Sequence, residues 1–183
     1  MKQMKKKTAM LLSVLMCAVL VLSGCGGSDT SSEEETDSAS EDTAQESAGG
    51  YVFTYNGVEI AVDADADAVF EALGDPVSSY DEESCAADGT AYIYTYSGFV
   101  ITTYPDGGAN LIGYITLKDD TVSTAEGIDF SMTMSDVTEA YGEDYTEDGS
   151  MRTYEKDGMK LNFVSGDDGE SIISIEYASS VMG

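Results

Sequence analysis

The side chains that could carry chemistry in this sequence are almost all acids. The 183 residues include 35 Asp and Glu, three Cys and no His. Without histidine the commonest general base near neutral pH is missing, and no serine or cysteine can have a histidine partner. The usual zinc sites are excluded for the same reason. A carboxylate pair could still cleave a glycoside, but the spacing of the acids selects no pair. We therefore predict a non-enzymatic protein without a cofactor.

Three alternating aspartates come closest to the pattern of a metal site. Asp63, Asp65 and Asp67 have the 1, 3, 5 spacing of an EF-hand calcium loop. That loop also needs glycine at position 6 and glutamate at position 12, where this chain has Ala68 and Gly74. Acids are also favoured in the first turn of a helix, whose N-terminus carries partial positive charge. We assign Asp65 and Asp67 to a helix start, with Asp65 as its N-cap, and predict no metal site.

Tyr92, Tyr94 and Tyr96 alternate in a run that predicts a strand, so the three side chains share one face. Such a stripe could stack on sugar rings, or it could pack in the core. A tight turn after Tyr96 places it opposite Phe99 and places Tyr94 opposite Ile101. Both partners are apolar, so we expect the stripe to face the core beneath a helix.

The opposite face of the same predicted strands is the candidate binding surface. An exposed apolar patch often marks a contact surface, and tyrosine suits interfaces. The alternative is that these side chains pack between two halves of the chain or against an N-terminal hairpin. The ligand-contact candidates are Val100, Thr102, Tyr104, Ile112 and Tyr114. The corresponding face later in the chain is more polar and comprises Lys160, Asn162, Val164, Ile172, Ser174 and Glu176.

The N-terminus predicts export and a lipid anchor. A start with four lysines precedes an apolar run over residues 9–22, as in a secretory signal. Leu22-Ser23-Gly24-Cys25 then resembles the lipobox of bacterial lipoproteins. The resemblance implies cleavage before Cys25, lipid attachment to its sulfur, and a location on the extracytoplasmic face of the cell membrane. The alternative is ordinary secretion with Cys25 unmodified. Cys85 has no intrachain disulfide partner in the exported form, and is either half-buried or a free thiol.

The exported chain is strongly acidic. Loss of residues 1–24 removes four of the eight basic residues and no acid, which leaves a formal charge of 4 − 35 = −31. This charge argues against binding to nucleic acid, which requires basic patches. Residues 25–50 comprise the lipidated cysteine and an acidic tether of small and polar residues, which cannot bury enough surface to fold. The oligomeric state is open.

Turn and periodicity signals place the elements of the folded part. Asn56-Gly57 between two alternating runs is typical of a two-residue β-hairpin, with Phe53 opposite Ile60. Helical spacing predicts helices over 65–73 and 133–141, each followed by glycine. Residues 77–89 are expected to form an acidic loop. The predicted strands cover residues 91–96, 99–104, 111–117, 151–156, 159–164 and 171–177.

Many of these signals recur 60 residues apart, as do Gly98 and Gly158 or Tyr94 and Tyr154. We therefore predict an α+β fold: an N-terminal β-hairpin followed by two tandem α-β-β-β units, with antiparallel meander sheets and the helices packed on one face. The predicted domains are a signal peptide over 1–24, the lipidated tether over 25–50, the hairpin with the first unit over 51–120, and the second unit over 121–183.

The second helix carries a family resemblance. Ser131-Met132-Thr133-Met134-Ser135-Asp136-Val137, followed by Gly142, resembles the Gly-Met-Thr, Val, Gly signature of the β-lactamase inhibitor protein family. The small lipoprotein of the outer-membrane barrel-assembly machinery has a similar signature. Residues 51–177 are also similar to uncharacterised lipoproteins of Gram-positive anaerobes. In this resemblance Thr133 caps the helix and Asp136 completes a capping box.

These observations together predict a membrane-anchored, extracytoplasmic lipoprotein that binds a protein or an envelope polymer. The alternative is a structural or assembly accessory of the cell envelope, which the resemblance to the barrel-assembly lipoprotein suggests.

Overall fold

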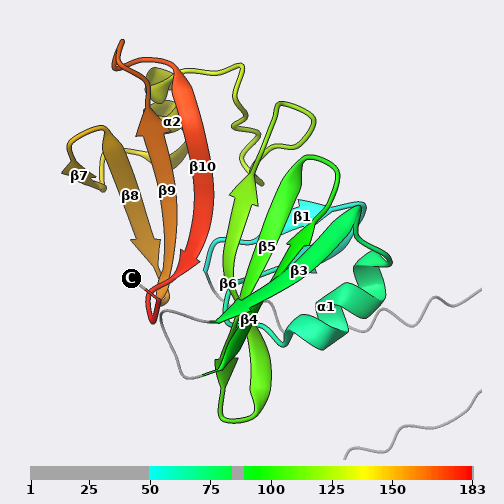
Figure 1. Ribbon diagram of the computed structural model, residues 1–183. Helices are drawn as coiled ribbons and strands as arrows, with labels where there is room; N and C mark the ends of the chain where they lie inside the picture. Colours follow the sequence, from blue (N-terminus) through cyan, green and yellow to red (C-terminus); the bar gives the residue numbers. More distant parts are fainter. Residues whose placement is uncertain (1–49, 84–88, 183) are drawn as a thin grey trace, which may run out of the picture. The chain divides into compact units, whose positions relative to one another are not determined.

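The computed structural model describes residues 50–83 and 89–182, and over these ranges the chain is mostly β. One antiparallel sheet has the strand order β3-β4-β5-β6-β10-β9-β8-β7 (Figure 1). Its strands are β3 (Ser78–Glu83), β4 (Thr90–Thr95), β5 (Phe99–Asp106), β6 (Ala109–Leu117), β7 (Thr146–Asp148), β8 (Met151–Lys156), β9 (Met159–Ser165) and β10 (Ile172–Ser179). The remaining elements are a hairpin of β1 (Phe53–Tyr55) and β2 (Val58–Ile60), and the helices α1 (Ala66–Leu73) and α2 (Met134–Tyr141).

The prediction of an α+β fold with two tandem α-β-β-β units is wrong. The described residues contain two helices of eight residues each beside an eight-stranded sheet. Each helix is followed by four strands, and the two sets of four join through β6 and β10 into one continuous sheet. The predicted boundary after residue 120 falls in the connection between β6 and α2.

The strands that the prediction missed, β3 and β7, form the two edges of the sheet. Residues 77–89 were expected to be a loop, but Ser78–Glu83 pairs with β4 along its whole length. Every residue of β3 and of β7 is exposed. An edge strand is held by hydrogen bonds on one side and is often rich in charge, which discourages further pairing. These two strands therefore lack the apolar alternation by which a strand is recognised.

The predicted hairpin is confirmed and covers the middle of the sheet. Asn56 and Gly57 have positive φ values of 51° and 82°, and Phe53 pairs with Ile60 as expected. The ring of Phe53 lies 5.0 Å from that of Phe99 on β5 and 6.0 Å from that of Tyr177 on β10, measured between centroids. The hairpin thus packs against both sets of strands at once and closes one face of the sheet over their junction.

Both helices begin at the predicted caps. The Asp65 carboxylate accepts hydrogen bonds from the backbone N–H groups of Asp67 and Ala68, at 3.0 and 3.4 Å. At α2, Thr133 and Asp136 form the reciprocal capping box. These contacts satisfy N–H groups that the first helical turn would leave unpaired.

The C-termini of both helices are tied to the sheet by tyrosine hydroxyls. Tyr96 donates to the carbonyl of Gly74 at 3.2 Å, and Tyr154 donates to that of Gly142 at 3.0 Å. Tyr96 also stacks on Phe99, with 5.1 Å between ring centroids. The expected core-facing stripe is therefore confirmed for Tyr96 and for Tyr94. The ring of Tyr94 packs against that of Phe70 on α1, with 4.0 Å between ring centroids. Tyr92, at the outer end of the stripe, is exposed.

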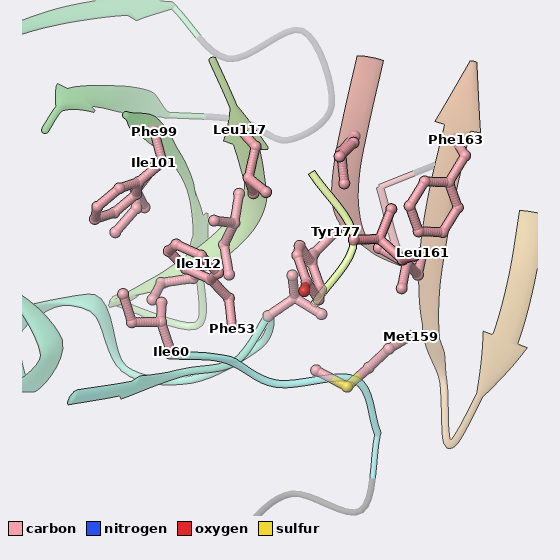
Figure 2. Close-up of a cluster of buried hydrophobic side chains, with 14 of the residues drawn as sticks. Phe53, Ile60, Phe99, Ile101, Ile112, Leu117, Met159, Leu161, Phe163 and Tyr177 are labelled. Carbon is pink, nitrogen blue, oxygen red and sulfur yellow. The ribbon is translucent and has the colours of Figure 1, made fainter. Parts of the chain in front are cut away.

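Two β-bulges, 60 residues apart, change which side chains enter the core. Gly113 on β6 is an extra residue that has no partner on β5. Ile173 on β10 is an extra residue that has no partner on β9. A bulge reverses the alternation beyond it. As a result Ile112 and Ile172 face the core, where Ile112 is completely buried (Figure 2). The expectation that both residues lie on the opposite face of the sheet is wrong for this reason.

Candidate functional site

The face of the sheet opposite the hairpin and helices, here called the open face, carries the candidate site. Strand register places one side chain from every strand in a single line across it, here called the central row. It contains five hydroxyls, one amide, one carboxylate and one apolar group. In strand order the central row is Ser78, Thr95, Val100, Thr116, Glu176, Asn162, Thr153 and Thr146. With a spacing of about 4.8 Å between strands, it is roughly 34 Å long.

The structure places three of the five sequence-predicted contact residues on the accessible part of this face. Val100 belongs to the central row, and Thr102 and Tyr114 pair with each other in the adjacent row. All three are partly exposed. Ile112 is separated from them by the bulge at Gly113 and is part of the core, so it cannot contact a ligand on this face.

Tyr104 is buried and has a structural role. Its ring lies 3.2 Å from the position that a Cβ would take on Gly113, and its hydroxyl donates to Asp63 Oδ1 at 2.7 Å. Burial and this hydrogen bond raise the pKa of Tyr104 to about 12, which keeps the hydroxyl protonated as a donor. Asp63, the first residue of the calcium-like spacing, thus anchors a tyrosine. No group of three metal-ligating residues is assembled within residues 50–83 and 89–182.

A groove of about 340 Å³ lies on the half of the open face built by β6 to β10. The residues that matter for its chemistry are Tyr114, Met151, Thr153, Lys160, Asn162 and Glu176. Thr153 donates to Asn162 Oδ1 at 2.8 Å, and Thr116 donates to Glu176 Oε2 at 3.4 Å. Neighbouring members of the central row are therefore joined by hydrogen bonds, which hold their polar atoms in place.

Glu176 and its neighbours were part of the polar face predicted for the second half of the chain, but they were not selected as contact residues. Selection by apolar character favoured the first half. The sequence signal that could have found them was the alternation of Lys160, Asn162 and Val164 with buried residues. Only the pairing of β10 with both β6 and β9 brings Thr116, Glu176 and Asn162 into one line.

Burial raises the pKa of Glu176, while hydrogen bonds from Asn162 and Thr116 act in the opposite direction. A folded-state pKa above the unfolded value means that the ionised form is less favourable in the folded protein. The contribution of this group to stability is present below its unfolded pKa and is lost as the pH rises through its folded pKa. At neutral pH the carboxylate therefore opposes folding.

We predict that Glu176→Gln gains stability relative to the wild type as the pH rises from about 4 to about 7. The amide keeps the shape of the side chain without the charge. Urea unfolding of both proteins at the two pH values measures the difference. Glu139→Gln, an exposed position on α2, is the matched control for the loss of one negative charge. An equal gain in the control would assign the effect to the overall charge of the protein.

A second hollow, of about 520 Å³, lies beside the start of α1. It is lined in part by Asp65, Asp67 and Asn110. The Asp65 carboxylate is already engaged as the helix cap, and among the described residues no hydrogen-bond network like that around Glu176 lines this hollow. We therefore take the groove on the open face as the candidate site.

Comparisons with protein-family models, curated proteins and solved structures returned no match to this chain. The resemblance to the β-lactamase inhibitor protein family and to lipoproteins accordingly stays a prediction. Cys25, where lipid attachment is predicted, and Cys85, which is predicted to be either half-buried or a free thiol, lie outside the described residues. Within those residues, neither helix has the length and apolar character needed to cross a bilayer.

Proposed function

We propose that the chain is a lipid-anchored, extracytoplasmic lipoprotein that binds a protein or envelope polymer without catalysis. The observation that carries the binding role is the asymmetry of the sheet. One face is closed by the hairpin and both helices, whereas the other is covered by no helix or hairpin of the described residues and is hollowed by a groove with hydrogen-bonded polar side chains. Ligand sites are typically concave and contain a few well-placed polar groups.

The anchor is tested by substitution of the proposed lipid-attachment residue. We predict that the wild-type chain sediments with membranes of a bacterial host and that Cys25→Ser moves nearly all of it to the soluble fraction, because several acyl chains are needed for stable anchoring. Mass spectrometry of the wild-type N-terminal peptide should show a diacylglycerol on Cys25. An unmodified thiol at this position would contradict the proposal.

The binding role is tested by capture from an envelope extract with the exported chain carrying Cys25→Ser. Asn162→Tyr places a bulky ring in the groove, and Ser135→Tyr places the same ring on the exposed surface of α2. We expect a captured ligand to be lost with Asn162→Tyr and retained with Ser135→Tyr. Equal capture by both variants would show that the groove is not the binding site.

A further inference from the structure

The central row presents the hydrogen-bonding groups that a hydroxyl-rich ligand needs. Hydroxyls both donate and accept hydrogen bonds, and the single amide adds two donors and one acceptor. The row crosses all eight strands, so it faces a chain that lies perpendicular to the strands. Tyr114, Lys160 and Glu155 of the adjacent row line the groove together with Thr153, Asn162 and Glu176 of the central row.

The charge of the site favours a cationic ligand. Glu176 is the one carboxylate in the central row and lies near its middle, where Thr116 and Asn162 bond to it. The groove around it is lined by two carboxylates, those of Glu155 and Glu176, and by one ammonium group, that of Lys160. A half-buried carboxylate gains when an ammonium group replaces the water that it has lost. The exported chain also carries 35 acidic and four basic residues, which attracts cations and repels polyanions over longer distances.

Two other ligand classes fit this surface less well. An uncharged polymer could bond the hydroxyls, but it would gain nothing from the excess of carboxylates over ammonium groups in the groove. A basic peptide could supply the charge, but a sheet recognises extended peptides by main-chain pairing at a strand edge. On the open face the backbone groups of the central strands are already paired with their neighbours.

We infer that the central row binds an amine-bearing glycan chain, with Glu176 as the ion-pair partner of one ammonium group, an assignment that rests on the proposed binding function. The hydroxyls of the glycan bond the Thr and Ser side chains of the row that are at least partly exposed and the amide of Asn162. Tyr114 lines the groove beside the row, where it packs against the sugar while its hydroxyl donates to the Met182 carbonyl at 3.1 Å.

The test uses oligomers of glucosamine, the same oligomers fully N-acetylated, and oligolysine of matched charge. Each is titrated into the exported chain carrying Cys25→Ser, and binding is measured by calorimetry at physiological salt. We expect the glucosamine oligomers to bind more tightly than either other probe, because only they combine amines with a chain of hydroxyls. Glu176→Gln should weaken this binding at least about tenfold, the size expected for loss of one charge-assisted hydrogen bond.

Glu139→Gln on α2 is the control for the change in net charge and should leave the affinity within about twofold, since screening weakens distant charges at this salt concentration. Circular dichroism establishes that each variant is folded. Equal weakening by both variants, or oligolysine binding as tight as that of the amine-bearing glycan, would show non-specific attraction and overturn the inference. Equal affinity for the N-acetylated oligomers would overturn the role of Glu176.

Failure of this inference is distinguishable from failure of the proposed function. If no glycan probe binds but capture from the envelope extract is still lost with Asn162→Tyr, the glycan assignment falls and the binding role stands. If capture is also insensitive to Asn162→Tyr, both fall.

Discussion

Ile112→Ala is expected to lower the free energy of unfolding by about 3 kcal/mol, within the range for truncation of a buried aliphatic side chain. Ile112 is completely buried in the cluster that contains Phe53 and Ile60 (Figure 2). Truncation leaves a cavity between the hairpin and the sheet, which the rigid strands can fill only in part. Urea unfolding of the exported chain, followed by circular dichroism, measures the loss.

The matched control removes the same atoms from a solvent-exposed isoleucine. Ile173 is 60% exposed at the equivalent bulge of β10, so Ile173→Ala should change stability by about 0.5 kcal/mol or less. This pair tests the bulge at Gly113 directly. If Ile112 lay on the open face, as simple alternation predicts, the two substitutions would have similarly small effects.

Gly98→Ala is expected to lower stability by roughly 3 kcal/mol, the sum of backbone strain and a steric clash. Gly98 has a φ of +87° in the turn between β4 and β5. An added Cβ would lie 2.6 Å from Thr121 Oγ1 and 2.9 Å from Val122 Cγ1. Thr121 cannot move aside easily, because its hydroxyl and backbone N–H are both bound to Asp119. Thermal and urea unfolding measure the effect.

The substitution Gly158→Ala, 60 residues later in the chain, measures the backbone strain without the steric clash. Gly158 occupies the turn between β8 and β9 with a φ of +80°, and no atom outside its immediate chain neighbours lies within 4 Å of the position that an added Cβ would take. Gly158→Ala should therefore cost about 1 kcal/mol, from backbone strain alone. Equal losses at the two glycines would mean that the contact with Thr121 and Val122 does not constrain the turn.

Several features of the fold could be predicted because their causes lie within a few residues of one another. The Asn56-Gly57 turn determines the hairpin register, and Thr133 with Asp136 determines the start of α2. The alternation around Tyr94 and Tyr96 correctly indicated their buried face. In each case backbone geometry and nearby side chains carry the information.

The candidate site was predicted only in part, because its composition depends on strand pairing. Val100, Thr102 and Tyr114 were placed correctly on the open face by alternation. Ile112 was misplaced, because the extra residue Gly113 reverses the alternation of side chains between the two faces of the sheet. No local sequence pattern indicates this bulge. Glu176 acquires its neighbours Thr116 and Asn162 from strands that are distant in the chain.

By itself, the sequence determined the caps, the hairpin, the turns and most of the strands, because short-range hydrogen bonds and steric preferences produce them. It also determined the absence of histidine and the acidic charge, which restrict the available chemistry. The tertiary structure alone decided that two sets of four strands form one sheet, that β3 and β7 complete its edges, and that the hairpin and helices of the described residues cover the same face of it. Those outcomes depend on hydrogen bonds and packing between residues far apart in the chain. The local conformational preferences of a segment do not determine such contacts.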